Sequence, residues 1–135
     1  MFKSPKIAIV GLGYVGLPLA IEFCKKYEVI GFDIDENRIS DLLDGIDKTK
    51  EVSKLKLKEA NNLILTKDMN LLSDVDVYII TVPTPVDKNN SPDLTALSSS
   101  SKLVGSFLKK NNIVIYESTV FPGCTEEICV PILSK

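Results

Sequence analysis

Three glycines spaced as GxGxxG, set between an apolar run and an amphipathic stretch, constrain this chain more than any other feature. Ile7 to Val10 is short and entirely apolar, which is typical of a strand buried on both faces of a parallel sheet. After Gly11-Leu12-Gly13-Tyr14-Val15-Gly16, apolar side chains recur with the spacing of one helix face, at Leu17, Ala20, Ile21 and Cys24. The pattern predicts a strand, a tight turn and a helix, an arrangement that binds the diphosphate of a dinucleotide.

Each glycine has its own expected role in such a turn. Gly11 allows the sharp turn, Gly13 lets the backbone approach a diphosphate, and Gly16 lets the helix pack close to the strand. The exposed N–H groups at the start of the helix would then face the diphosphate, and Tyr14, which lies between Gly13 and Gly16, is expected to contact the cofactor too. The alternative is that these glycines only form a tight turn between a strand and a helix.

Asp33 supplies the acidic partner that such a turn requires. It follows a second apolar run, 29–32, where its carboxylate can accept hydrogen bonds from ribose hydroxyls and would repel a 2′-phosphate. NAD is therefore expected rather than NADP. Arg38 could serve a 2′-phosphate, but beside Asp33 we assign it to the adenosine edge of NAD. The alternative for Asp33 is that it only caps the next helix.

Strands and helices alternate along the rest of the chain. We expect strands at 63–66, 77–82 and 113–116. A first helix would carry Ile39, Leu42 and Leu43 on one face, and further helices would span 53–60 and about 94–109. A last helix would begin from an N-cap at Thr125. Gly45 is expected to end the first of these helices, and Thr81 to Pro92 to form a loop. Repeated strand–helix units predict an α/β fold with a doubly wound parallel sheet, a Rossmann-type domain over residues 1–135.

Hydroxyl-bearing residues follow the last two predicted strands. Ligands bind beyond the carboxyl ends of the strands in an open parallel sheet, so these segments would lie beside the nicotinamide half of NAD. The hydroxyl-bearing residues are Thr81 and Thr84 at the end of one strand, with Pro83 between them, and Ser118 and Thr119 after the other strand. Each could equally be a turn or capping residue. Glu117, at the same edge, could simply pair with a lysine.

The composition excludes several other classes of protein. A chain of 135 residues with a net charge of −2 has no electrostatic footprint for DNA or RNA. There is no apolar run long enough to span a membrane and no signal peptide at the start, so we expect a cytoplasmic protein without a membrane partner. The chain has no histidine, and its three cysteines lack metal-site spacing, so we expect free thiols and no metal.

Four segments, GLGYVGLPLA, FDID, TVPTP and ESTVFPG, occur in the order and spacing of the UDP-glucose/GDP-mannose dehydrogenase family, which the chain resembles over nearly its whole length. Within that family, GIDKTKEV, TVPTPVD, PDL and YESTVFPGCTEEICVPIL are most similar to the branch that acts on UDP-N-acetylhexosamines for surface polysaccharide synthesis. The resemblance implies oxidation of a sugar C6 alcohol to a carboxylate with two NAD molecules in turn. It also implies a homodimer at full length. UDP-glucose and GDP-mannose stay open as alternative substrates.

The resemblance also implies roles for single residues. Val15, Asp33, Arg38, Thr84 and Thr119 match positions that contact NAD, and Thr119 also matches a supporting residue near the reacting carbon. The family's catalytic cysteine, its general base and most of its nucleotide-sugar site correspond to sequence beyond residue 135. We do not expect the cysteines present, Cys24, Cys124 and Cys129, to replace that nucleophile. The chain alone should then bind NAD without turnover.

Two other kinds of protein share a strand, a GxGxxG turn and an acid. One is the regulatory nucleotide-sensing module of channels and transporters, which does not need the hydroxyl-rich segments at 81–85 and 118–119. The other is a different dehydrogenase family with a similar first domain, such as the 3-hydroxyacid dehydrogenases, against which ESTVFPG argues. No role is assigned to Thr49 or Glu51.

Overall fold

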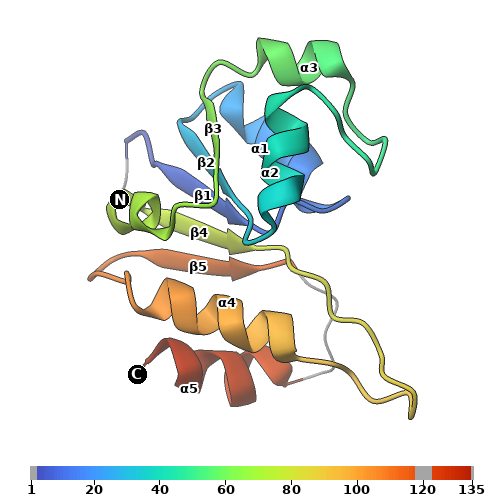
Figure 1. The fold of residues 1–135 in the computed structure, drawn as a ribbon. Coiled ribbons are helices and arrows are strands. Elements are labelled where there is room, and N and C mark those ends of the chain that lie inside the picture. Colours follow the sequence, from blue (N-terminus) through green and yellow to red (C-terminus); the bar gives the residue numbers. More distant parts are fainter. Residues whose placement is uncertain (1–2, 118–122, 135) are drawn as a thin grey trace.

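The computed structural model describes residues 3–117 and 123–134, and its centre is a five-stranded parallel sheet in the order β3-β2-β1-β4-β5 (Figure 1). The strands are β1 (Ile7–Val10), β2 (Val29–Phe32), β3 (Leu63–Thr66), β4 (Val77–Ile80) and β5 (Ile113–Tyr116). The α-helices are α1 (Gly16–Cys24), α2 (Glu36–Leu43), α3 (Lys54–Glu59), α4 (Thr95–Gly105) and α5 (Val130–Leu133), with a 3₁₀ helix η1 (Met69–Asp74) and a π-helical turn η2 (Thr125–Cys129). The predicted Rossmann-type sheet is confirmed.

Helices cover both faces of the sheet, and the strands supply apolar side chains to each face in turn. Ile7 and Ile9 of β1 pack in a core with α1, α2 and α3, whereas Ala8 and Val10 pack in a second core with η1, α4 and η2. Figure 1 shows the first group of helices above the sheet and α4 and α5 below it. A four-residue strand that is apolar throughout is explained by this burial on two sides.

The strand order reverses at β1, and this positions the site. Val10 is in register with Phe32 on one side and with Ile80 on the other, so β1, β2 and β4 end side by side. The segments that follow these strands therefore leave the sheet at one place, where the order reverses. In open α/β sheets this is the point at which ligands bind.

Four details differ from the sequence-based expectations. Leu43 was expected on the buried face of α2 but is 66% exposed, because a helix turns by about 100° per residue beyond buried Leu42. The helix predicted to reach Lys109 ends at Gly105, after which Lys109 N–H bonds to the Asn112 side chain in a turn.

The other two differences concern the start of the last helix, which the sequence pattern placed wrongly, and a 3₁₀ helix, which it did not predict. Thr125 is not an N-cap, since Cys124 before it already has helical dihedral angles and no side chain caps this turn. The 3₁₀ helix η1 was not predicted, and its N-cap is Asp68, whose side chain accepts the Asn70 N–H. None of the helices in the described part of the chain has the length and apolar character of a membrane span.

Candidate functional site

The glycine turn has the geometry that its three positions require. Gly11 has a φ of +104°, a left-handed conformation that favours glycine. A Cβ on Gly16 would lie 2.5 Å from Thr81 Oγ1 and closer still to the Gly11 carbonyl oxygen, whereas a Cβ on Gly13 would meet nothing within 4 Å. The expected turn at Gly11 and the close packing at Gly16 are confirmed. The contact of Gly13 with a diphosphate stays a prediction.

The start of α1 carries no side-chain cap. Its N-cap is Val15, which makes no side-chain cap hydrogen bond, whereas Asp35 caps α2 and Ser53 caps α3. The first N–H groups of a helix have no partner within the helix and lie at the positive end of its dipole. This end of α1, beside the open face of Gly13, is therefore suited to an anionic group.

Asp33 joins the end of β2 to the glycine turn. One carboxylate oxygen accepts the Leu12 N–H at 2.9 Å, and the other accepts the Asp35 N–H at 2.9 Å. The residue that caps α2 is Asp35, so the alternative that Asp33 only caps the next helix is wrong. A carboxylate can accept about four hydrogen bonds, which leaves Asp33 capacity for ribose hydroxyls.

Arg38 is held against the same turn from the other side. Its Nε donates to the Leu12 carbonyl oxygen at 2.7 Å, and its Nη1 forms an ion pair with Asp47 at 2.9 Å. The side chain is only 11% exposed, and Nη2 is buried without a partner among the described residues. Arg38 lies along the predicted cofactor cleft, but its guanidinium is engaged by the protein itself.

Asp47 is a residue of this site that the sequence reasoning missed. Its side chain is fully buried and accepts hydrogen bonds from the Thr49 N–H and hydroxyl and from the N–H groups of Glu51 and Val52. Burial alone would raise its pKa, but these bonds and Arg38 outweigh burial and lower the pKa of Asp47 to about 2. The usable signal was an Asp followed two residues later by Thr, a pattern typical of an Asx turn.

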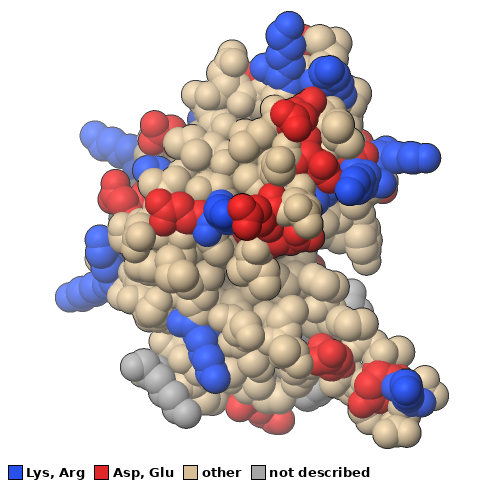
Figure 2. All heavy atoms as spheres, in the orientation of Figure 1, with Lys and Arg blue, Asp and Glu red and all other residues tan. Residues whose placement is uncertain are grey.

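A cleft opens beside the glycine turn at the carboxyl edge of the sheet. Its larger hollow, of about 690 Å³, is lined by Gly13, Asp33, Ile34 and Arg38, and by α4 on the opposite wall. Figure 2 shows the surface hollowed between the upper block of helices and the loop that projects at the lower right. A second hollow, of about 420 Å³, continues past Tyr14.

The two hollows share the segment 81–85 as a wall. The Thr81 hydroxyl is bonded to the Gly11 carbonyl oxygen at 2.6 Å, so it ties β4 to the glycine turn. Pro83 lines both hollows, and Thr84 lines the smaller one together with Val15 and Glu117. Glu117 makes no ion pair with a lysine in the described part of the chain. Ser118 and Thr119 lie outside the described residues.

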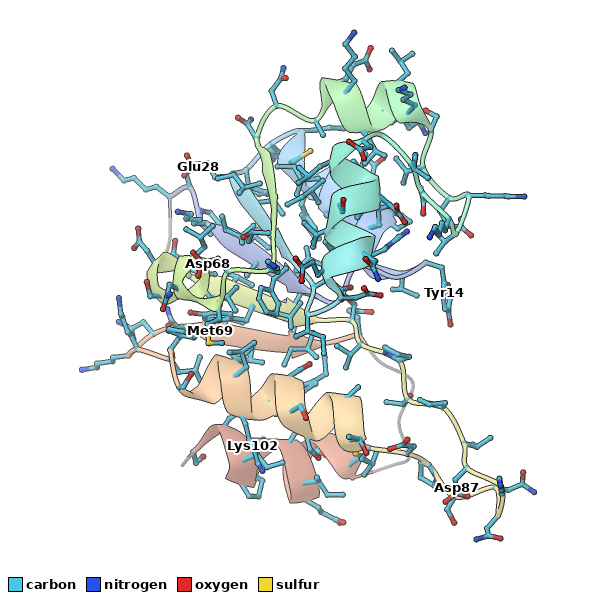
Figure 3. The ribbon with its side chains drawn as sticks, in the orientation of Figure 1. Tyr14, Glu28, Asp68, Met69, Asp87 and Lys102 are labelled. Carbon is cyan, nitrogen blue, oxygen red and sulfur yellow. The ribbon has the colours of Figure 1, made fainter. Side chains whose placement is uncertain are left out.

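Tyr14 and the loop after β4 flank the smaller hollow from opposite sides. In Figure 3 Tyr14 points away from the sheet at the start of α1, and Asp87 marks the tip of the projecting loop. Tyr14 is 69% exposed, so its ring is accessible to a ligand in the smaller hollow. The cofactor contact predicted for Tyr14 stays a prediction.

The three cysteines are all free and buried, in the cores of the fold. Burial raises the pKa of the Cys24 and Cys124 thiols, which disfavours the thiolate. None of the three lines either hollow of the cleft. The described residues also contain no group of histidine, cysteine or acidic side chains that could hold a metal ion.

Comparison with known proteins gives the same picture. The model of the UDP-glucose/GDP-mannose dehydrogenase family, NAD binding domain, matches residues 5–135. The chain is 56% identical over 133 residues to UDP-N-acetyl-D-glucosamine 6-dehydrogenase of Pseudomonas aeruginosa, covering 98% of this chain and 32% of that protein. It is 53% identical over 129 residues to protein CapL of Staphylococcus aureus, covering 96% of this chain and 30% of that protein.

Solved structures of dehydrogenases superpose on the whole fold. A UDP-D-ManNAc dehydrogenase from Pyrococcus horikoshii is 35% identical with a TM-score of 0.88, covering 95% of this chain and 31% of that one. A GDP-mannose dehydrogenase from Pseudomonas aeruginosa is 29% identical with a TM-score of 0.86, covering 94% of this chain and 31% of that one. The chain thus spans about a third of the length of the relatives that it matches.

Proposed function

The chain belongs to the UDP-glucose/GDP-mannose dehydrogenase family, whose NAD-binding domain it matches, and we propose that it binds one NAD molecule along its two joined hollows. The family assigns NAD as the cofactor, as the sequence predicted, and distinguishes the chain from a channel-type regulatory module and from the 3-hydroxyacid dehydrogenases. The assignment of single residues to parts of NAD is our proposal.

The adenosine half would occupy the larger hollow. Asp33 offers carboxylate oxygens for the ribose hydroxyls, and Ile34, which is 81% exposed, offers an apolar side chain for the flat face of the adenine ring. The hollow has the size and the largely apolar lining of ordinary ligand sites, which have volumes of roughly 300–1,000 Å³.

The diphosphate would lie over Gly13, and the nicotinamide would extend into the smaller hollow. The uncapped N-terminus of α1 supplies N–H groups and the positive end of a helix dipole to the diphosphate. Val15, Pro83 and Thr84 then line the nicotinamide half, with Glu117 beside them. Ser118 and Thr119 are proposed to complete this end, Ser118 because it follows the last strand of the sheet and Thr119 because the family resemblance implies it.

One observation carries this proposal: among the three glycines of the turn, only Gly13 faces open space. Gly11 and Gly16 are surrounded by the turn itself and by Thr81. The free space over Gly13 is next to the uncapped helix end and Asp33, so of the three glycines Gly13 is the one whose backbone a phosphate can approach.

For the whole protein we propose oxidation of the C6 alcohol of a UDP-sugar to the uronic acid with two NAD molecules. A UDP-N-acetylhexosamine is the favoured substrate, in surface polysaccharide synthesis. The chain is 56% identical to a protein named UDP-N-acetyl-D-glucosamine 6-dehydrogenase and 53% identical to protein CapL. We also propose that residues 1–135 form one domain, and that the other domains hold the nucleotide sugar and the homodimer interface.

The chain alone is proposed to bind NAD without turnover. The family resemblance implies that a cysteine thiolate traps the aldehyde intermediate, and the cysteines present are buried and line neither hollow of the cleft. Thr119 would act there only as a supporting residue near the reacting carbon.

Calorimetric titration of the chain with NAD, and separately with NADP, tests the proposal. We expect NAD to bind, and NADP to bind at least about tenfold more weakly, which is ~1.4 kcal/mol. No heat of binding from a folded chain would refute the assignment of the cleft. Production of NADH on addition of a UDP-sugar would refute the absence of turnover.

A further inference from the structure

Arg38 and Asp33 hold opposite ends of one residue at the edge of the cleft. Arg38 Nε bonds to the carbonyl oxygen of Leu12, and the Asp33 carboxylate accepts the N–H of the same residue. The guanidinium is therefore separated from the group proposed to bind the ribose by one backbone unit and the two hydrogen bonds at its ends. A cation at this position is a potential partner for a 2′-phosphate, and a site for NAD has to prevent that pairing.

We propose that Asp47 determines the specificity of this site for NAD over NADP by fixing Arg38 and cancelling its charge. This inference rests on the proposed function. Asp47 contacts Arg38 and lines neither hollow of the cleft, so its proposed role is that of a positioning residue. Its fully buried carboxylate engages Nη1, the Leu12 carbonyl engages Nε, and Nη2 is itself buried, so the guanidinium is not presented as a free bidentate fork for a phosphate.

The local structure keeps Asp47 in this position independently of the cofactor. Thr49, Glu51 and Val52 donate four hydrogen bonds to its two oxygens, which fixes the carboxylate in the turn after α2. The Leu12 carbonyl fixes the other edge of the guanidinium. Arg38 is thus held at two points by the protein, and its rotation toward the ribose requires loss of the ion pair with Asp47.

The test compares the ratio of the dissociation constants for NADP and NAD in the unaltered chain and in Asp47→Asn. Asparagine keeps the shape and an acceptor for the turn but removes the charge. We expect the ratio to fall by about three- to tenfold, because an uncancelled positive charge about 10 Å or less from a doubly charged phosphate attracts it. The change should shrink as salt is raised.

A matched control and a double variant separate this role from a general structural one. Asp44→Asn removes the same charge from an exposed carboxylate at the end of α2, outside the Arg38 cluster, and should leave the ratio unchanged. In an Arg38→Gln background, Asp47→Asn should no longer change the ratio, since the two residues act as a unit. If Asp47→Asn does not fold, Asp47→Ser, which also keeps an acceptor in the turn, takes its place.

Three results would overturn the proposal. One is an unchanged ratio in a folded Asp47 variant, and another is an equal fall in Asp44→Asn. The third is a fall that persists without Arg38, which would show that Asp47 acts through the shape of the turn alone. Each of these results would still be compatible with NAD binding by the unaltered chain, and so with the proposed function. Failure of the unaltered chain to bind NAD would instead refute the proposed function, and this inference with it.

Discussion

Gly13 and Gly16 are three residues apart in one turn, and the structure predicts opposite consequences when each is changed to alanine. At Gly16 the added methyl group would lie 2.5 Å from Thr81 Oγ1 and 2.9 Å from the Gly11 carbonyl carbon. Both neighbours are fixed, because Thr81 Oγ1 and the Gly11 carbonyl oxygen are hydrogen-bonded to each other at 2.6 Å. The methyl group can be accommodated only if the helix moves away from the strand ends.

The magnitude follows from the kind of contact. Overpacking a well-packed site costs about 1–3 kcal/mol, and a clash with fixed backbone lies at the upper end of that range. Gly16→Ala should therefore lower the free energy of unfolding by about 3 kcal/mol. At Gly13 nothing lies within 4 Å and φ is not left-handed, so alanine should change stability by less than about 0.5 kcal/mol, or raise it slightly.

The assay measures two quantities for each variant, the free energy of unfolding in urea and the affinity for NAD. Gly16→Ala should have a lower free energy of unfolding than the unaltered chain. Gly13→Ala should keep the free energy of unfolding but bind NAD more weakly, since its methyl group fills the space assigned to the diphosphate. A destabilised Gly13→Ala, or one that is stable and binds NAD as tightly as the unaltered chain, would refute the reasoning.

Three further predictions concern single polar contacts. Asp33→Asn should weaken NAD binding by about 1–3 kcal/mol in calorimetry, the cost of a lost charged hydrogen bond, and an unchanged affinity would contradict the ribose assignment. Asp47 has its pKa lowered from 3.8 to about 2, so about 2 kcal/mol of stability should be present above pH 3.8 and lost as the pH falls through 2. Urea unfolding should show that this loss is absent in Asp47→Asn. Ser101→Ala should cost about 0.5–1.5 kcal/mol, measured the same way, because it removes the 2.7 Å hydrogen bond between the Ser101 and Tyr116 hydroxyls, and an unaltered midpoint would contradict a contribution of that bond to stability.

The sequence was sufficient for the strands and for the first half of the site because the physical signals there are local. A run such as Ile7–Val10 is apolar at every position since both of its faces are buried, and the GxGxxG turn lies next to it in the chain. The meeting of Gly11, Asp33 and Thr81 also followed from a general rule, since parallel strands end at one edge of the sheet.

The Arg38 cluster could not be predicted in the same way because its contacts are not local. Arg38 reaches the carbonyl of Leu12, 26 residues earlier, and Asp47 in the turn after α2. Nothing in the spacing distinguishes a guanidinium that faces the cofactor from one that is bound by the protein. The exposed Leu43 was misjudged for a related reason, since one residue of helical rotation separates a buried face from solvent.

The contacts around the glycine turn have a common consequence for binding. Asp33 at the end of β2, Arg38 of α2 and Thr81 after β4 each bond to the backbone of Gly11 or Leu12. The turn is therefore held from three separate elements by contacts within the protein, and we expect binding to need little ordering of the chain. Pre-organisation of this kind lowers the entropic cost of association, so the affinity of the isolated chain for NAD should depend on these three side chains even though only Asp33 is proposed to touch the ribose.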